Sequence, residues 1–321
     1  MIDIREAMSS VLPNTKAPLK KGDNPLKGDG ISRAVKAWQN AKPPQDSFTD
    51  YIRASSIGYL CPREFVLNYW YPAPNKKFDW KAQMMMDMGT YLHSYLQDIL
   101  GQMGVLWGKW WPVDGPSYNG FSLCSDALYE ELFVEDDKYR FKGHLDGFVC
   151  LNRIEAITSN QKEYKKDPRG FRERLDGIEP NLQLLEIKTT GNYGFKKLKE
   201  TGDIPASYKM QAAIYQKCTG KESTLFWYIN RDTMESLVLP YNYEESQWKA
   251  CARKADYIWR AIKEERLPSG GELCANANDT RAKKCIHCNK CFDSAAEDGI
   301  PEQKKVLLDE GRKLLNLEDY V

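Results

Sequence analysis

Four ionisable or amide side chains in this sequence stand beside strongly apolar runs. Asp146 lies in "GHLDGF", Glu186 and Lys188 lie in "LLEIKTT", and Gln211 lies in "YKMQAAIY". Burying a carboxylate without a partner costs several kcal/mol. These positions therefore require a metal ion or a mutual pairing of the side chains.

The E-x-K spacing has a direct consequence if the segment is a strand. Side chains alternate along a strand, so Glu186 and Lys188 point to one face and Ile187 to the other. If the strand that carries Asp146 pairs with this one, two carboxylates meet, and they repel unless a cation neutralises them. Mg²⁺ or Mn²⁺ is suited to this because hard cations prefer oxygen ligands. Lys188 would then stabilise negative charge on a phosphate.

A purely structural interpretation exists for each residue. Asp-Gly is a common hairpin signal, so Asp146 in "LDG" can be a turn residue, and Glu186 and Lys188 can form a surface ion pair. The apolar neighbours in "LLEIKTT" instead favour burial of the pair.

The elements that must position these residues follow from apolar periodicity. Steps of three and four predict a helix over 80–104. Its expected core face is Met85, Met88, Leu92, Leu96, Ile99 and Met103. Aromatic and β-branched residues predict strands at "VLWGKWW", "ALYEELFV" and "YRFKGHLDGFVCL". "LQLLEIKTT" is apolar on both faces and is therefore expected in the centre of a sheet.

The remaining segments complete an α/β fold, a central mixed sheet flanked by helices. "PASYKMQAAIYQKCTG" is predicted to be a helix that stops at Gly220, "STLFWYIN" and "MESLVLPY" are predicted strands, and 244–266 is a further helix. We expect a flexible arm over 1–47, one domain over 48–295 with a charged insertion at about 152–180, and a helical tail over 296–321.

Taken in chain order, four motifs resemble the PD-(D/E)XK nuclease superfamily. "GTYLH" (Gly89–His93) looks like G-x-x-x-H, "GHLDG" like the motif of the first metal carboxylate, "LEIKTT" like E-x-K, and "QAAIY" like Q-x-x-x-Y. The resemblance spans about residues 55–291. It is strongest to the RecB-like branch, which includes CRISPR-associated exonucleases and AddB-type iron–sulfur nuclease domains.

The resemblance implies a restriction-endonuclease-like core and a role for each matching residue. Mg²⁺ or Mn²⁺ would be held by His93, Asp146, Glu186 and the backbone carbonyl of Ile187. Catalysis would depend on Asp146 and Glu186, on Lys188 assisting the attacking water, and on Gln211 with Tyr215. Read alone, His93 is a histidine satisfied in the core.

Nine cysteines are many for a reducing compartment, where disulfides are rare. Cys285, Cys288 and Cys291 in "CIHCNKC" have the spacing C-x₂-C-x₂-C, which indicates a metal. Cys274, or His287, would complete a zinc site. The resemblance instead implies a 4Fe–4S cluster with Cys61 as fourth ligand, which would staple the C-terminal segment to the domain, although the family's usual cysteine spacing differs.

Basic residues near these motifs are candidate DNA contacts. The insertion carries Phe171, a stacking platform for an unpaired base, and basic side chains that can follow a phosphate backbone. The basic candidates are Lys165, Lys166, Arg169 and Arg172 in the insertion, and Lys196 and Lys197 after the E-x-K strand. The alternative for the insertion is a solvated loop of mixed charge.

Composition limits the class of protein. The chain has 321 residues, 28% of them charged, and a formal net charge of +1, so any basic surface must be local. It has neither a membrane-spanning apolar run nor a signal-peptide pattern, so we expect a cytoplasmic location and no membrane contact. There is no G-x-x-x-x-G-K-S/T loop, so unwinding would need a separate helicase or recombination partner.

The expected function is that of a metal-dependent deoxyribonuclease. It would act as an exonuclease on DNA ends or single strands, in repair, recombination or replication. One alternative is a non-catalytic nucleic-acid-binding or assembly factor on the same scaffold. Cleavage of RNA by the same chemistry is another, because nothing in the sequence tests for a 2′-hydroxyl.

Overall fold

The computed structural model describes residues 37, 50–72, 79–111, 117–118, 121–122, 128–176, 180–268, 274 and 276–292. The chain divides into two units, one of residues 1–43 and 77–83 and one of residues 44–76 and 84–321. Apart from the first turn of one helix, the elements below belong to the second unit. The arm expected at 1–47 falls outside the described residues except for Ala37, and the tail expected at 296–321 falls entirely outside them.

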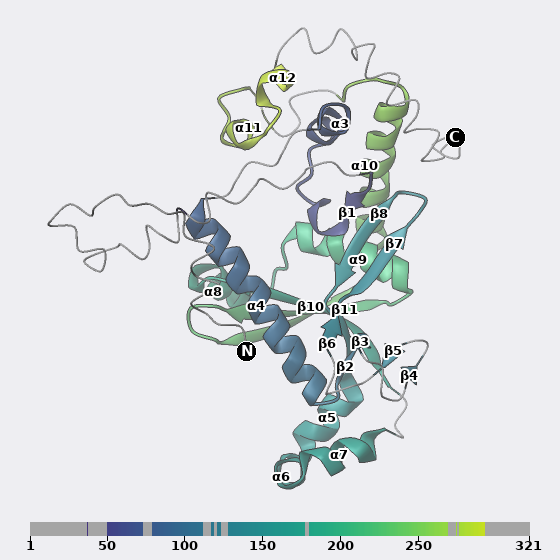
Figure 1. The fold of residues 1–321 in the computed structure, drawn as a ribbon, viewed down its shortest axis with the longest axis vertical. Helices are drawn as coiled ribbons and strands as arrows, with labels where there is room; N and C mark the ends of the chain where they lie inside the picture. Colours follow the sequence, from purple (N-terminus) through teal and green to yellow (C-terminus); the bar gives the residue numbers. More distant parts are fainter. Residues whose placement is uncertain are drawn as a thin grey trace, which may run out of the picture. The chain divides into compact units, whose positions relative to one another are not determined.

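The central sheet has five strands in the order β12-β11-β10-β9-β2 (Figure 1). The middle strand β10 (Leu182–Thr190) pairs in parallel with β11 (Ser223–Asn230) and antiparallel with β9 (Gly147–Cys150). β12 (Ser236–Asn242) and β2 (Leu106–Trp107) form the edges. The mixed sheet and the central place of "LQLLEIKTT" are confirmed.

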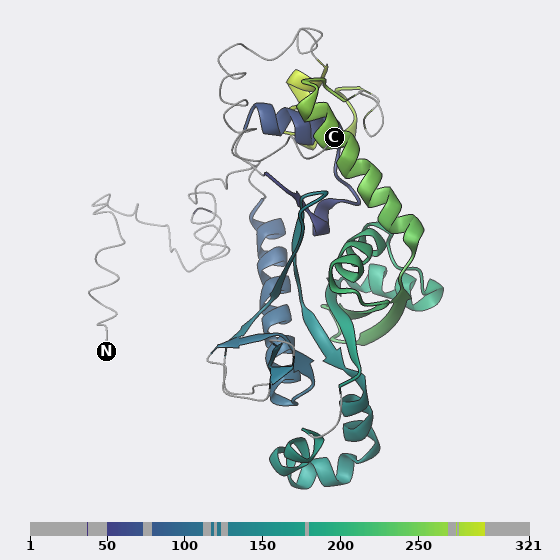
Figure 2. The ribbon, with the colours of Figure 1, turned by 90° about the vertical axis from the view of Figure 1, so that its right-hand side faces the viewer.

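A second, three-stranded sheet has the order β1-β8-β7, formed by β1 (Ile52–Arg53), β8 (Phe141–Leu145) and β7 (Leu132–Asp136). β8 and β9 are separated by Asp146 alone, so one stretch of chain leaves this sheet and enters the central one (Figure 2). The single strand predicted over "YRFKGHLDGFVCL" is therefore two strands broken at Asp146.

Gly147 explains the break in physical terms. Its φ is +148°, and a Cβ there would lie 2.6 Å from the Leu106 side chain and 2.6 Å from the Tyr129 hydroxyl. A side chain fits neither the backbone conformation nor the space. "LDG" thus marks a change of sheet, and the hairpin alternative for Asp146 is wrong.

Helices cover both faces of the central sheet. On one face, α4 (Trp80–Gln102) packs Leu96 and Leu100 into an apolar cluster with Leu185 and Ile187 of β10. On the other face, α9 (Ala206–Thr219) packs against Leu184. The expected α/β fold, a mixed sheet flanked by helices, is confirmed.

Two further helices complete this second layer. α8 (Asn192–Thr201) packs against β11, and α10 (Glu245–Lys263) packs against α9. Gly220 follows α9 with φ +67°, the left-handed conformation that commonly ends a helix at glycine.

The expected core face of α4 is only partly buried. Met85 and Met88 are 46% and 54% exposed, whereas Leu96 and Met103 pack against the core. Apolar periodicity predicts the helix, but it cannot tell which of the turns are covered by the rest of the chain.

The charged insertion folds as three short helices, α5 (Leu151–Ser159), α6 (Gln161–Lys166) and α7 (Pro168–Leu175). Pro168 at the first turn and Asp167 as N-cap, accepting from the Gly170 N–H, account for the start of α7. The short strands β3 (Lys109–Trp111) and β6 (Leu128–Glu130) pair with each other, as do β4 (Ser117–Tyr118) and β5 (Phe121–Ser122).

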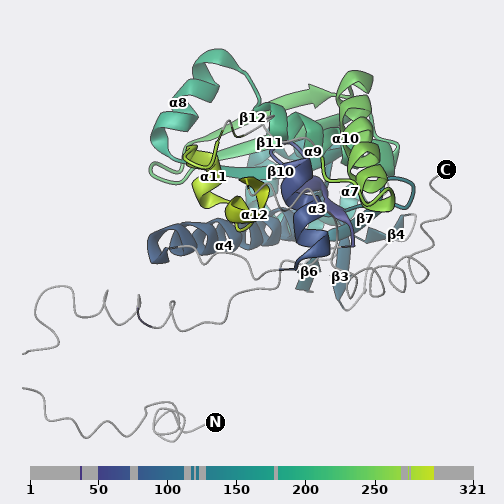
Figure 3. The same cartoon turned by 90° about the horizontal axis from the view of Figure 1, so that it is seen from above.

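Two short helices, α11 (Thr280–Lys284) and α12 (Cys288–Phe292), form the cysteine segment, which lies beside α3 (Pro62–Trp70). α12 packs against α3, and α11 precedes α12 (Figure 3). A 3₁₀ turn, η1 (Ala54–Ser56), lies ahead of α3 and packs against α9. Over the part of the chain that is described, no helix is both long and apolar enough to cross a membrane.

Candidate active site

The candidate site forms where β8 passes into β9. The backbone pairing of β9 with β10 ends at Gly147 and Leu185. Beyond that pair, the side chain of Asp146 takes the place of a backbone acceptor for β10. Asp146 Oδ2 accepts a hydrogen bond of 2.6 Å from the Ile187 N–H. The carboxylate is therefore fixed against the E-x-K strand by a backbone donor.

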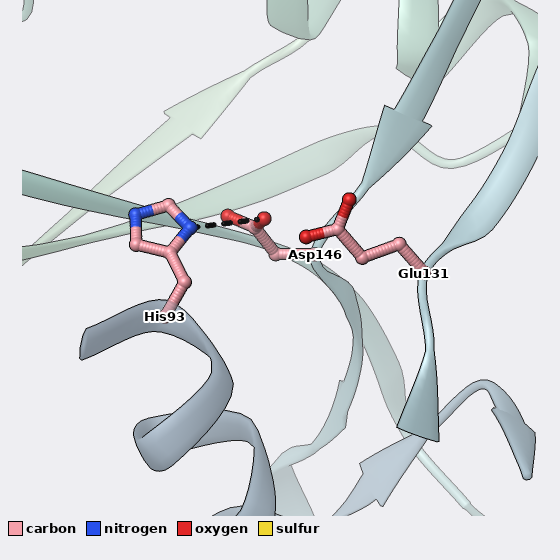
Figure 4. A group of neighbouring side chains, drawn as sticks. All are labelled: His93, Glu131 and Asp146. Carbon is pink, nitrogen blue, oxygen red and sulfur yellow. Dashed lines mark ion pairs between the residues drawn. The ribbon is translucent and has the colours of Figure 1, made fainter. Parts of the chain in front are cut away.

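His93 approaches the same carboxylate from α4. Its Nδ1 lies 3.4 Å from Asp146 Oδ1 (Figure 4). Gly89, one helical turn earlier on the same face, would place a Cβ 3.4 Å from Thr189 Oγ1. The G-x-x-x-H spacing thus combines a close approach of α4 to β10 with an imidazole directed at Asp146.

Glu131 is a member of the site that the sequence analysis missed. It lies between β6 and β7, and its carboxylate faces Asp146 (Figure 4). His93, Glu131 and Asp146 offer ligand atoms within 4.8 Å of one another, the only such group of three His, Cys, Asp or Glu residues in the described ranges. Alternation in "YEELF" indicates that one of the two adjacent glutamates points inward, but it does not tell which one.

Two neighbours hold the Asp146 main chain in place. Gln97 Nε2, one turn after His93 on α4, donates to the Asp146 carbonyl at 3.1 Å and lies 3.4 Å from Glu131 Oε1. The Tyr129 hydroxyl donates to the same carbonyl at 2.7 Å. The Asp146 carbonyl at the break between β8 and β9 therefore accepts from two side chains, and neither neighbour was predicted.

A second chain of contacts begins at the E-x-K pair. Lys188 Nζ lies 2.6 Å from Glu186 Oε2 and donates to Gln211 Oε1 at 3.4 Å. Gln211 Nε2 donates to the Tyr215 hydroxyl at 3.2 Å, and that hydroxyl donates to the His144 carbonyl at 2.8 Å. The predicted Glu186, Lys188, Gln211 and Tyr215 thus form one connected set.

Tyr215 is buried and connects α9 with β8. It is 2% exposed, and its hydroxyl links α9 to β8. A Cβ at Gly143 would lie 2.7 Å from its ring, so glycine provides the space for it. Tyr215 therefore positions Gln211 and cannot contact a nucleic acid directly.

Burial and neighbouring charge set the protonation of the carboxylates. Burial, with a further contribution from Asp146, raises the pKa of Glu186 to about 7 against the opposing charge of Lys188. Burial and the charge of Asp146 also raise the pKa of Glu131. Burial would raise the pKa of Asp146 as well, but the His93 hydrogen bond, Lys188 and the Ile187 N–H outweigh it and hold that pKa below its ordinary value.

Lys188 remains a cation in this environment. Burial lowers its pKa, but the charges of Glu186 and Asp146 outweigh that effect, and the net pKa lies above the ordinary value for lysine. Its side chain is therefore a fixed positive charge and hydrogen-bond donor.

The donor set fits a hard divalent cation. The carboxylates of Asp146 and Glu131 lie together with the imidazole of His93. Magnesium and manganese ions prefer such oxygen-rich sites. Glu186 is 2% exposed, and its Oε1 is a buried oxygen with no hydrogen-bond partner among the described residues. A buried carboxylate oxygen in this state is a free ligand atom.

The five cysteines proposed as metal ligands are Cys61, Cys274, Cys285, Cys288 and Cys291, and the fold brings their segments together. Cys61 is the N-cap of α3, which packs against α12, and Arg63 Nη2 of α3 donates to the Cys291 carbonyl at 2.9 Å. Burial raises the pKa of Cys274, with smaller contributions from Cys61 and Cys291, which places these three cysteines near one another. Burial raises the pKa of Cys285 to about 12. The fold thus gathers the thiols predicted to share a metal.

The spacing of their sulfur atoms leaves both metal alternatives open. Zn–S bonds of about 2.3 Å in a tetrahedron place the sulfurs ~3.8 Å apart. No three of these cysteines have sulfurs within 4.8 Å of one another in the residues that the structure describes. The 4Fe–4S cluster and the zinc alternative both stay predictions.

The candidate DNA contacts differ in their surroundings. Lys165, Lys166 and Arg169 are exposed on α6 and α7. Arg172 donates to the Gln102 carbonyl at 3.0 Å. Phe171 is 6% exposed and packs against Tyr164, so its predicted role in stacking on unpaired bases is wrong.

Lys196 and Lys197 are exposed on α8. α8 begins at Asn192, shortly after β10 ends at Thr190. These two lysines therefore follow the E-x-K strand by less than two helical turns, and their DNA contact stays a prediction.

Comparison with known proteins gives a distant likeness. No protein-family model matches the sequence, and no curated protein matches it. Among solved structures, LHK-Exo in complex with dAMP is similar with a TM-score of 0.39 and 13% identity, over 67% of this chain and 89% of that chain.

Two further solved structures are similar at the same level. The alkaline exonuclease LHK-Exo from Laribacter hongkongensis has a TM-score of 0.38 and 14% identity over the same shares of the two chains. SSO0001 has a TM-score of 0.36 and 15% identity over 81% of this chain and 96% of that chain. Scores this low assign no function to the chain.

Proposed function

We propose that this protein is a divalent-metal-dependent nuclease that hydrolyses phosphodiester bonds in DNA. One observation carries the proposal. The Asp146 carboxylate is held by His93 on one side and by the Ile187 N–H on the other, beside the buried pair of Glu186 and Lys188. The order of the four motifs along the chain supports assignment to the RecB-like branch.

Mg²⁺ or Mn²⁺ would be held by His93 and Asp146, with Glu131 and Glu186 as the flanking carboxylates. The N–H and C=O of one strand residue point to the same side, so the Ile187 carbonyl is directed toward the side on which Asp146 lies. The cation would supply Lewis-acid activation of the phosphodiester and of the attacking water.

Lys188 acts on the substrate phosphate, and Gln211 orients Lys188. Because the pKa of Lys188 is raised, its ammonium stabilises negative charge that develops on the phosphate, and it does not act as a general base. Gln211 Oε1 accepts from that ammonium and orients it. Tyr215 fixes the Gln211 amide in turn.

The substrate is proposed to be DNA with free ends or single-stranded character, processed in repair, recombination or replication. Lys196 and Lys197 on α8 would contact the phosphate backbone, and a separate helicase would supply unwinding. A 4Fe–4S cluster on Cys61, Cys285, Cys288 and Cys291 would hold the C-terminal segment against α3. The motif resemblance supports the substrate and the cluster. The exposure of Lys196 and Lys197 supports their contact with DNA, and the lack of a G-x-x-x-x-G-K-S/T loop in this sequence supports a separate helicase.

Metal-dependent cleavage by the purified chain tests the proposal. End-labelled single-stranded DNA, duplex DNA and RNA of one sequence are incubated with Mg²⁺, with Mn²⁺ and with EDTA. We expect stepwise shortening of DNA with either metal and none with EDTA. Binding of DNA without cleavage under all conditions would contradict the proposal and favour a scaffold. Cleavage of RNA alone would overturn the choice of substrate.

A further inference from the structure

Tyr59 is a large aromatic residue left exposed beside the candidate active site. Its side chain is 58% exposed, and it lies in the short segment between η1 and α3. The role inferred for it below rests on the proposed function, because it concerns how the same site selects its substrate.

Gly58 presses this segment against the start of α9. A Cβ at Gly58 would lie 2.4 Å from Ser207 Cα and 2.5 Å from Ser207 Cβ, so only glycine permits the contact. Ser207 precedes Tyr208, and Lys188 Nζ lies 5.0 Å from the centre of the Tyr208 ring. Tyr59 is thus placed next to the residues that surround the catalytic lysine.

Electrostatics agrees with this position. Burial of part of the side chain and the neighbouring Tyr208 raise the pKa of Tyr59, and the charges of Arg53 and Lys188 oppose that rise. The Tyr59 side chain therefore lies close enough to Tyr208, Arg53 and Lys188 for their charges to act on it.

The main chain around Tyr59 is anchored from several elements. Lys254 of α10 donates to the Ile57 carbonyl at 2.8 Å, and the Tyr59 N–H donates to the Ser56 carbonyl at 3.1 Å. The Arg281 guanidinium of α11 donates to the Tyr59 carbonyl. An exposed ring on a backbone held at three points costs little entropy when it binds a ligand.

We propose that Tyr59 is a stacking subsite for an unpaired nucleobase of the nucleotide next to the phosphate at Lys188. Every base has a π-face, so stacking on an aromatic ring tolerates any sequence. Inside a duplex both faces of every internal base are already covered by its neighbours. The subsite therefore selects single strands or frayed ends over intact duplex.

An exposed tyrosine is common on protein surfaces, and α4 provides the comparison. Tyr91 is 77% exposed and lies two residues from His93, so it faces away from the site on the helix. Tyr91 therefore serves as a matched control for Tyr59.

The test measures binding of DNA oligonucleotides that carry 2-aminopurine at the end, with Ca²⁺ present and the oligonucleotide verified as intact. We expect Tyr59→Leu to weaken single-strand binding at least about fivefold, the lower end of base–aromatic stacking. It should also reduce the 2-aminopurine fluorescence change, while duplex affinity changes less than about twofold. Tyr59→Phe should keep both signals, because the ring stacks and not the hydroxyl. Tyr91→Leu should match the parent.

Three results would overturn the subsite. These are unchanged single-strand binding by Tyr59→Leu, an equal loss for single strands and duplex, or a loss in Tyr59→Phe as large as in Tyr59→Leu. Cleavage assays of the same variants separate the two proposals. If the parent binds and never cleaves while Tyr59→Leu loses binding, the nuclease proposal fails and the subsite stands. If the parent cleaves and Tyr59→Leu is unaffected, the subsite fails alone.

Discussion

At the scale of single residues, Asp146 is the residue that connects the other members of the site. Its two oxygens are engaged by His93 and by the Ile187 N–H, and it raises the pKa of both Glu131 and Glu186. Three carboxylates around one position are stable only when their charge is balanced. Lys188 supplies one positive charge, and a divalent cation would supply the rest.

Glu131 is expected to contribute directly to metal affinity. Glu131→Gln removes a charged oxygen ligand from the group with His93 and Asp146, so the Kd for Mn²⁺ should rise about tenfold or more. Isothermal titration calorimetry measures the change. Glu130→Gln, at the neighbouring exposed position, is the control. Equal Mn²⁺ affinities in the two variants would exclude Glu131 as a ligand.

The raised pKa of Glu186 predicts that the stability of the metal-free protein depends on pH. Its pKa of about 7 in the fold lies above the ordinary 4.5, so the folded chain holds this proton more tightly than the unfolded chain. The stability contributed by this group is present below about pH 4.5 and is lost as the pH rises through about 7. Glu186→Gln cannot ionise, so in EDTA its Tm relative to the parent should be higher at pH 8 than at pH 5. A constant Tm difference at both pH values would contradict this.

At the scale of elements, the sequence predicts most of the strands and helices that hold the site. "LQLLEIKTT" and "PASYKMQAAIYQKCTG" are predicted well because apolar patterns and end signals such as Gly220 are local properties. The break at Asp146 and the exposure of Met88 depend on which distant segments cover them. Contacts between distant segments cannot be read from the local pattern of a single sequence.

The break between β8 and β9 should depend on Gly147. Gly147→Ala introduces a Cβ 2.6 Å from two side chains at φ +148°, and we expect a loss of ~2 kcal/mol or more in unfolding free energy. Gly202→Ala is the matched control, because Gly202 has φ +64° with nothing within 4 Å of its Cβ, and should cost about 1 kcal/mol. Urea denaturation compares the two. Equal losses would show that packing at the break is unimportant.

At the scale of the whole molecule, one site draws on segments far apart in the chain. Motif order pointed to His93, Asp146, Glu186 and Lys188, because each belongs to a short recognisable pattern. Glu131 and Tyr59 have no such pattern, and their place depends on tertiary contacts such as Gly58 against Ser207. The cysteine segment reaches the same region, since Arg281 donates to the Tyr59 carbonyl.

The cysteine ligands predict the metal content of the purified protein. If Cys61, Cys285, Cys288 and Cys291 hold a 4Fe–4S cluster, protein purified without oxygen should be brown and contain about four irons per chain. Metal analysis and the visible spectrum measure this. Cys218→Ser, at a cysteine outside the segment, should keep the iron, and Cys288→Ser should lose it. One zinc per chain and no colour would contradict the cluster.

The most direct test of the central claim compares Lys188→Ala with the parent in Mn²⁺-dependent cleavage of end-labelled DNA. Removing the partly buried ammonium takes away charge stabilisation of the phosphate, so the rate should fall by about 100-fold or more. DNA binding and Tm verify that the variant is folded. Lys249→Ala, an exposed lysine on α10, should cleave at the parental rate. Parental cleavage by folded Lys188→Ala would contradict the account.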